Sequence, residues 1–224
     1  MANLTPRRSL SKTARHTATA ISSARQPALT ATAGDLRVKP LPPSEASALA
    51  SDGRRRLRAH VNSACFHIVL IEPEIPPNTG AVARTCAATG AVLHLVGPMG
   101  FEVSDRSVRR AGLDYWHLVD VRTYENSASF LSQAPVSRLR LFTTESERNL
   151  FATQDKPPLS PGDYLVFGKE STGLDPSWAA RFPDQTVSIP MPGAIRSLNL
   201  SNAVAIALYE GLRQTGALAS AFLG

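Results

Sequence analysis

Short apolar runs that alternate with helical stretches constrain the fold of this chain more than any other feature of its sequence. The first run, Phe66–Ile71, is rich in β-branched residues and ends at Glu72-Pro73, which is typical of a buried strand. Later runs predict further strands at Ala91–Val96, His117–Val121, Leu139–Thr143, Tyr164–Phe167 and Thr186–Ile189. Strands that alternate with helices form a mostly parallel sheet, so the sequence predicts an α/β domain.

The stretches between these strands carry helix signals. Helices are expected from Asn78 to about Gly90, near Asp105–Ala111, near Glu125–Leu131, near Pro176–Arg181, and at Asn199–Gln214, which is the last and longest. Asn78 is the expected N-cap of the first helix. No run of about 18 apolar residues is present to span a membrane.

The first 60 residues have a composition of their own. Residues 1–34 contain no acidic side chain, and they are rich in Ser, Thr, Ala and Arg. That composition favours an organelle transit peptide, with a disordered basic tail as the alternative. The sequence therefore predicts a leader over residues 1–60 and one folded domain over residues 61–224, in a plastid or mitochondrion, with the cytoplasm as the fallback.

The net charge of +6 resides in this leader. Residues 1–60 hold 11 of the 24 Lys and Arg residues but only 3 of the 18 acidic ones, a balance of +8, so the remainder carries −2. Bulk charge is therefore no evidence that the folded part binds RNA. Two cysteines and five histidines match no zinc pattern, and no metal is expected.

Three polar segments follow predicted strands. The first is Glu72–Arg84, which holds three prolines and then Asn78-Thr79-Gly80; the second is Phe167–Leu174, which begins with Phe167-Gly168 and contains Glu170; the third is Ile189–Ala203. In that third segment Ser197, Asn199, Ser201 and Asn202 exceed what one helix cap needs. Because open α/β sheets bind ligands at the carboxyl ends of their strands, the three loops are expected to converge on one crevice.

Read alone, each segment also has an ordinary structural explanation, as a capped helix, a simple turn or a helix start. No G-x-G-x-x-G pattern occurs, so a dinucleotide oxidoreductase is unsupported.

Taken together in this order, the three segments resemble the motifs of the SPOUT-class RNA methyltransferases. Glu72–Pro77 and Arg109–Tyr115 resemble in particular the subfamily that methylates the 2′-hydroxyl of the tRNA wobble nucleotide (cytidine or uridine), called TrmL. The resemblance covers about Phe66–Gly216. It implies a deep C-terminal trefoil knot, S-adenosylmethionine as methyl donor, tRNA as substrate, and a homodimer whose active site uses both subunits.

The resemblance also implies roles for individual residues. The cofactor-binding residues would be Phe142, Thr143, Gly168, Ile189, Met191, Ser197 and Leu198, with Thr144 in the same loop. The residues around the reacting hydroxyl would be Arg84, Glu170, Asn199 and Ser197. Tyr209 matches a position near the subunit interface. One departure is Glu145-Ser146-Glu147, where relatives carry Lys-Gly, and this change is expected to weaken contact with tRNA.

Methyl transfer to a hydroxyl needs alignment of oxygen, methyl carbon and sulfur, and removal of a proton. A guanidinium with a pKa above about 12 is a poor base, so Arg84 is expected to bind the adjacent phosphate and orient the hydroxyl. Near-normal turnover of an Arg84→Lys enzyme would contradict that role.

One basic cluster lies in the predicted folded part. Asn78, Arg106, Arg109 and Arg110 are the candidate RNA-binding residues, and the arginines lie close to Tyr115 and Trp116. A solvated helix face is the alternative for the arginines. For the whole chain, the alternatives are 2′-O-methylation of another RNA such as rRNA, and a catalytically silent RNA-binding or assembly factor of the same fold.

Overall fold

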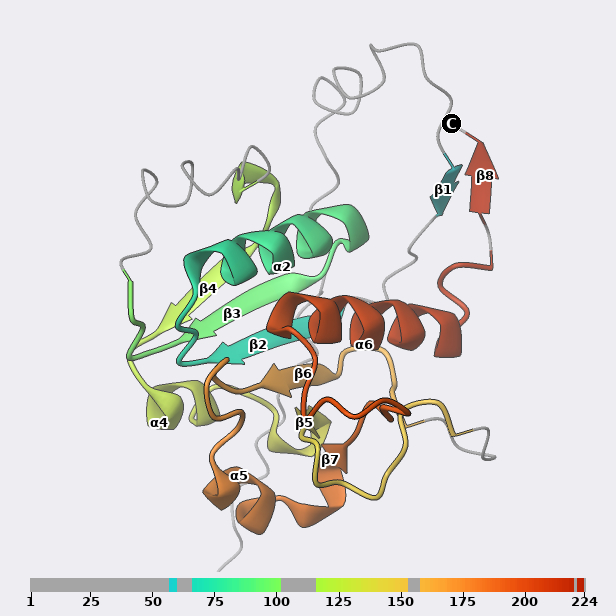
Figure 1. Ribbon diagram of the computed structural model, residues 1–224. Coiled ribbons are helices and arrows are strands. Elements are labelled where there is room, and N and C mark those ends of the chain that lie inside the picture. The colour runs from blue at the N-terminus through green and yellow to red at the C-terminus, as the bar shows by residue number, and fades with distance from the viewer. Residues whose placement is uncertain (1–56, 60–65, 102–115, 153–157, 220, 224) are drawn as a thin grey trace, which may run out of the picture. The chain divides into compact units, whose positions relative to one another are not determined.

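Six parallel strands form the centre of the computed structural model of this chain, which describes residues 57–59, 66–101, 116–152, 158–219 and 221–223 (Figure 1). Their order in the sheet is β4-β3-β2-β6-β5-β7, and every neighbouring pair is parallel. The strands are β2 (His67–Ile71), β3 (Val92–Val96), β4 (Val121–Tyr124), β5 (Leu139–Phe142), β6 (Tyr164–Phe167) and β7 (Thr186–Val187). The predicted α/β class is confirmed.

Helices cover both faces of this sheet, as a parallel sheet requires. On one face lie α2 (Pro76–Thr89) and α6 (Leu200–Gln214), and on the other lie α4 (Ser127–Leu131) and α5 (Pro176–Arg181). Successive side chains of a strand point to opposite faces, so β2 serves two cores. Ile68 and Leu70 pack toward α2 and α6, whereas Val69 and Ile71 pack with Phe130 and Trp178 of the opposite face.

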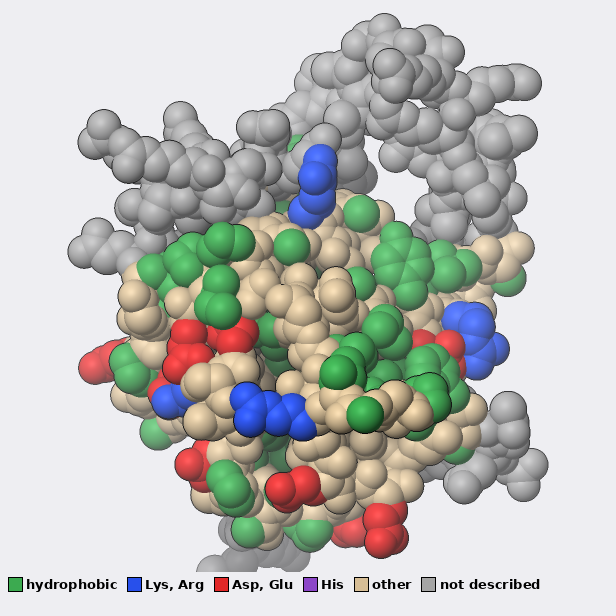
Figure 2. Space-filling model, in the orientation of Figure 1, with side chains coloured by type: hydrophobic (Ala, Val, Ile, Leu, Met, Phe, Trp, Pro, Cys, Tyr) green, Lys and Arg blue, Asp and Glu red, His purple; other side chains and the backbone are tan. Residues whose placement is uncertain are grey.

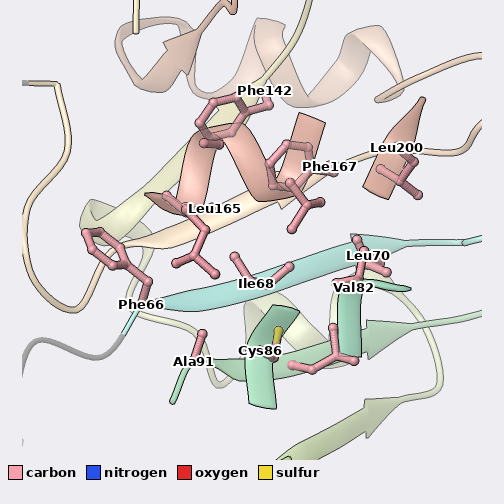
Figure 3. Packing of buried hydrophobic residues seen from close by; sticks show 14 of the residues in the cluster. Phe66, Ile68, Leu70, Val82, Cys86, Ala91, Phe142, Leu165, Phe167 and Leu200 are labelled. Atoms are coloured by element: carbon pink, nitrogen blue, oxygen red, sulfur yellow. The ribbon is translucent and has the colours of Figure 1, made fainter. Parts of the chain in front are cut away.

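The larger core lies under α2 and α6 (Figure 3). Val82 and Cys86 of α2 meet Ile68 and Leu70 of β2 there, and all four side chains are fully buried or nearly so. Gly211 of α6 sits against Phe66, and a Cβ at Gly211 would come within 2.9 Å of the Phe66 ring. A small residue is therefore required where α6 crosses the start of β2.

The start of α2 corrects one prediction. The helix begins at Pro76 with Ile75 as N-cap, so Asn78 lies inside the first turn and is not the cap. Pro76 and Pro77 have no N–H that needs a partner and have φ fixed near the helical value, which suits them to the first helical positions. The helix ends as expected, with Gly90 in the left-handed region at φ 72°.

The segment after residue 115 contains a second correction. Trp116–Leu118 is a 3₁₀ helix, and the strand predicted at His117–Val121 begins only at Val121 and runs to Tyr124. Trp116 and Val119 pack against the larger core without joining the sheet. Their apolar character indicated burial, but a short apolar run does not distinguish a strand from a turn of helix.

The remaining predicted elements agree closely with the structure. Strand β6 and helix α5 have the predicted bounds, and α6 starts one residue after Asn199, its N-cap. The helix predicted near Glu125 begins at Ser127 because Asn126 caps it through a capping box. Strand β7 is shorter than predicted, with Ser188 making an isolated bridge to Asn149.

Some predictions fall outside the described residues. The helix near Asp105–Ala111 lies there, as does nearly all of the predicted leader. Within the leader range, Leu57–Ala59 forms β1, which pairs antiparallel with β8 (Ala221–Leu223) near the C-terminus. The boundary at residue 60 stays a prediction. Among the described residues, no helix is both long enough and apolar enough to cross a membrane.

Candidate active site

A cavity of about 600 Å³ opens at the carboxyl ends of β5, β6 and β7, beside the first turn of α6. All three polar segments singled out in the sequence contribute to its walls, so their predicted convergence is confirmed. The volume is in the range of small-molecule sites. The lining residues with predicted roles are Asn78, Phe142, Thr143, Thr144, Gly168, Glu170, Ile189, Met191, Ser197, Leu198 and Asn199.

Two stacked aromatic rings give the cavity an apolar wall. Phe142 at the end of β5 and Phe167 at the end of β6 have ring centroids 4.6 Å apart and planes 13° apart (Figure 3). Both are held by the larger core and line the cavity. The wall is therefore rigid and suited to the flat, apolar part of a ligand.

The loop after β6 folds tightly on itself. Lys169 and Gly173 exchange two backbone hydrogen bonds of 3.0 and 2.9 Å, and Gly173 has a φ of +76°. A Cβ at Gly168 would lie 2.1 Å from the backbone of Gly173 and Leu174. Gly168, which the resemblance assigns to the cofactor, is thus also required by the loop's own backbone.

Glu170 lines the cavity, but its carboxylate is already used by the protein. Oε2 accepts a hydrogen bond from the backbone N–H of Glu74 at 2.8 Å, and Oε1 accepts from the N–H of Ile75 at 3.2 Å. Oε1 also accepts from Asn78 Nδ2 at 3.0 Å. The carboxylate therefore sits at the N-terminus of α2, where the helix dipole favours negative charge.

Asn78 connects Glu170 to the third segment. Its Oδ1 accepts a 3.0 Å hydrogen bond from Asn199 Nδ2. Asn199 in turn caps α6, since its Oδ1 accepts from the N–H groups of Ser201 and Asn202 and from Ser201 Oγ. Of the four polar residues that seemed to exceed one helix cap, Asn199 is the cap and Ser201 donates its hydroxyl to it, whereas Asn202 contributes only its backbone N–H. Ser197 lines the cavity and has an exposed side chain.

Glu72, at the start of the first polar segment, has an unusual backbone conformation. It is the one non-glycine residue with positive φ (50°) in the described part of the chain. Its carboxylate forms a 2.6 Å ion pair with Lys169, and this hydrogen bond raises the pKa of Lys169 above its ordinary value. Backbone strain of this kind persists where neighbouring contacts fix it.

Arg84 is the predicted catalytic residue that the cavity lacks. It is exposed on α2 and is not among the lining residues. It lies six residues after Asn78, about 9 Å further along the helix axis. Arg106, Arg109 and Arg110 fall outside the described residues, so their predicted contacts with RNA stay predictions.

Arg196 is a lining residue that the sequence interpretation missed. Its neighbour Ser197 was selected, and the position of Arg196 within the same loop was the available signal. The cavity is also lined by Glu145 and Asp175 at its exposed rim. Within the described part of the chain, no group of three or more His, Cys, Asp or Glu residues could hold a metal ion.

Comparison with known proteins places this site in context. Residues 65–209 match the model of the SpoU rRNA methylase family. The chain is 47% identical over 154 residues to a tRNA (cytidine(34)-2′-O)-methyltransferase of Burkholderia pseudomallei (strain 1106a), covering 67% of this chain and 96% of that protein. It is 44% identical over 152 residues to a protein of the same name from Saccharophagus degradans, covering 67% and 96%.

Solved structures of methyltransferases have a similar fold. One of them, from a study of the 2-OH methylation of C/U34 on tRNA, is 47% identical to this chain with a TM-score of 0.63, and the match covers 68% of this chain and 97% of that one. The SpoU methyltransferase AviRb from Streptomyces viridochromogenes, in complex with AdoMet, is 25% identical with a TM-score of 0.57, covering 70% and 60%.

Proposed function

The chain belongs to the SpoU methylase family, and from this premise we propose that it transfers a methyl group from S-adenosylmethionine to the ribose 2′-hydroxyl of the wobble nucleotide, position 34, of tRNA. The observation that carries the proposal is the convergence of the three motif loops on one cavity, in a chain 47% identical to a tRNA (cytidine(34)-2′-O)-methyltransferase.

The cavity fits the methyl donor. Phe142, Ile189, Met191 and Leu198 offer apolar surface for an adenine ring, and Thr143, Gly168 and Ser197 offer polar groups for its ribose and amino-acid parts. When bound, the donor supplies an electrophilic methyl carbon on a sulfonium that leaves as a neutral thioether. Because this leaving group departs without charge, it needs no cation to stabilise it, and we propose that no metal takes part.

On the acceptor side, the described residues orient rather than abstract protons. Both oxygens of Glu170 already accept N–H groups, so this carboxylate serves to hold the loop and Asn78 in place. Ser197 has an exposed hydroxyl at the cavity and can bind the substrate ribose or the donor. We propose that Arg84 binds the adjacent phosphate and orients the 2′-hydroxyl. As the O–CH₃ bond forms and the S–CH₃ bond breaks, the hydroxyl proton passes to that phosphate or to water.

Arg84 does not line the cavity of its own chain, so we propose that the active site is completed in a homodimer. Hydrophobic side chains gather over α6 and the loop before it (Figure 2). Tyr209 of α6 is 47% exposed and Ile195 of the preceding loop is 62% exposed, and apolar surface that gathers in one area is typical of an interface. A second copy would bury this surface and bring its own α2 toward the cavity.

We further propose that the loops around the cavity are threaded as the trefoil knot that the family resemblance implies. The family match and the six-stranded parallel sheet support it. The Ser- and Arg-rich first 34 residues support delivery to a plastid or mitochondrion.

A second candidate function is the same reaction on ribosomal RNA. The description of the matched family, which names rRNA, favours it. A silent RNA-binding factor is the third, and it would be distinguished by failure to bind S-adenosylmethionine in calorimetry.

The proposed function is tested with two matched tRNA transcripts, one carrying ribose and the other 2′-deoxyribose at position 34. With labelled S-adenosylmethionine and the full-length protein, the ribose transcript should accept label and the deoxy transcript should not, because the acceptor oxygen is missing. Equal labelling of both transcripts would place the methyl group elsewhere.

A further inference from the structure

Two loops at the cavity hold each other through reciprocal side-chain to backbone contacts. The carboxylate of Glu74 accepts hydrogen bonds from Ser171 N at 3.0 Å and Ser171 Oγ at 2.9 Å. The carboxylate of Glu170 accepts from the N–H groups of Glu74 and Ile75. Each loop therefore fixes the carboxylate of the other. The ion pair between Glu72 and Lys169 joins the same two loops.

These contacts set the direction of a longer chain of hydrogen bonds. A carboxylate has no hydrogen to donate, so Asn78 must turn its Nδ2 toward Glu170. That leaves Asn78 Oδ1 facing Asn199, which must donate through its own Nδ2. Asn199 Oδ1 is then the atom that faces the N-terminus of α6, where only an acceptor can cap the helix.

The direction of these hydrogen bonds matters because reversed side-chain amides would break the last of them, at the start of α6. If Asn78 and Asn199 both flipped, the NH₂ group of Asn199 would face the N–H groups of Ser201 and Asn202, and donors would meet donors. The cap of α6, which lies beside the Ser197-Leu198 wall of the cavity, would be lost. The orientation at Asn199 is thus fixed from both ends, by the carboxylate of Glu170 through Asn78 and by the N–H groups at the start of α6.

We propose that Glu74 is a positioning residue for methyl transfer: by binding Ser171 it holds Glu170 in place, and Glu170 orients Asn78 and Asn199 at the cavity. This inference rests on the proposed function. It assigns a role to a residue that does not line the cavity and acts only through others.

The surroundings of Glu74 favour this role over one in stability. Glu74 is an exposed loop residue and takes no part in either core. The hydrogen bonds from Ser171 lower the pKa of Glu74, so it remains an acceptor for both Ser171 donors at neutral pH. Exposed polar contacts add little to global stability, but they can fix a loop relative to its neighbours.

The test uses the full-length protein with Glu74→Ala, Glu74→Gln, Ser171→Ala and the Glu74→Ala/Ser171→Ala double variant. Glu125→Gln, an exposed glutamate beside α4 and away from the cavity, is the control. Three quantities are measured: hydrogen exchange of the Asn78 and Asn199 side-chain amides by NMR, affinity for S-adenosylhomocysteine by calorimetry, and kcat with KM for methyl transfer.

Glu74→Ala should speed exchange of both amides and lower kcat by about tenfold, with a thermal midpoint near that of the wild type. Ser171→Ala should have a smaller effect of the same kind, since the Ser171 N–H remains. Glu74→Gln should lie between Glu74→Ala and the wild type. The double variant should be no worse than Glu74→Ala, because both changes remove one interaction.

Unchanged amide exchange and kcat in Glu74→Ala would overturn the proposal, and so would additive losses in the double variant. A large fall in thermal midpoint with kcat of the folded fraction unchanged would also overturn it, in favour of a structural role. If the wild type methylates no RNA, the proposed function fails by itself. The role of Glu74 is then still decided by amide exchange and by affinity for S-adenosylhomocysteine.

Discussion

At the scale of single residues, the two cationic side chains that line the cavity differ in whether they form an ion pair. Among the described residues, the cations that line it are Lys169 and Arg196, and Lys169 is held in an ion pair by Glu72. Arg196 is exposed and forms no ion pair within the described part of the chain. Glu145 and Asp175 at the rim would repel an RNA backbone, and Lys169 is already paired. Arg196 is therefore the lining residue that is suited to bind a phosphate.

We therefore expect Arg196→Gln to weaken tRNA binding and leave S-adenosylmethionine affinity unchanged. The logarithm of the binding constant falls linearly with the logarithm of the salt concentration. Removing one phosphate-binding cation makes this slope less steep by about 0.7 for single-stranded RNA such as an anticodon loop. Binding measured over a salt series should show that reduction.

The matched control is Arg181→Gln, because Arg181 lies over the ring of Phe182 and away from the cavity. An unaltered salt slope in Arg196→Gln would contradict the assignment. Loss of cofactor affinity instead would place Arg196 against the carboxylate of the methyl donor.

The residues assigned to the cofactor were taken from the family resemblance, not from residue type alone. All seven predicted cofactor-binding residues line the cavity. The uses of Glu170 and Asn78 were beyond sequence reasoning, because Asn78 lies 92 residues from Glu170 and 121 residues from Asn199 along the chain. The crowding that requires a glycine at position 168 was not predicted either, since the crowding atoms belong to a loop that returns on itself.

At the scale of elements, the sheet carries a buried polar chain on its α4 side. His67 of β2 and His94 of β3 share a 2.9 Å hydrogen bond, and His94 Nδ1 lies 2.9 Å from the hydroxyl of Tyr124 in β4. His67 also stacks on Tyr164 of β6 at 4.1 Å. Burial, with a smaller effect from Arg122, lowers the pKa of His67 to about 4, and burial with the adjacent His67 lowers the pKa of His94 to about 3.

These shifts predict how stability depends on pH. Both histidines are neutral in the folded protein but take up protons near pH 6.5 when it unfolds. The unfolded state therefore binds more protons as pH falls from about 6.5 toward 4, and stability decreases over that window by at most about 1.4 kcal/mol per pH unit for each histidine. Asp120 opposes the shift in both cases, although as a smaller effect.

Urea unfolding between pH 7 and 4.5 measures this slope. In His94→Gln the slope should fall to about half that of the wild type, because one of the two titrating groups is gone. An Asp120→Asn variant should steepen it slightly. A slope that is the same in the wild type and in His94→Gln would show that other groups govern the acid sensitivity.

The strands also show where the hydrophobic pattern of the sequence is enough to predict their bounds. Strands β2, β3 and β6 were predicted within one residue because they are buried on both faces and read as continuous apolar runs. Strand β4 sits at the edge with exposed Arg122 and Thr123, and its weaker pattern allowed the preceding Trp116–Leu118 to be mistaken for its beginning. Edge strands carry less of the pattern that prediction uses.

At the scale of the whole molecule, the parallel sheet brings the motif loops to one end. Residues as distant in sequence as Asn78 and Asn199 meet there, joined by a 3.0 Å hydrogen bond. The α/β class followed from alternating runs, but the strand order did not, since β5 and β6 lie on the far side of β2 from β3 and β4. Order depends on the crossover paths, which local sequence patterns do not encode.

Methylation of the wobble ribose of tRNA is the activity on which the roles proposed for the cavity depend. To test it, the full-length protein is incubated with labelled S-adenosylmethionine and a mixture of unmodified tRNA and rRNA, and the label is mapped to single nucleotides. We expect label on the ribose of nucleotide 34 of tRNA, and its loss in Arg84→Ala. Label on rRNA or at another tRNA position would contradict the proposed substrate, and no label on any RNA would contradict the proposed activity.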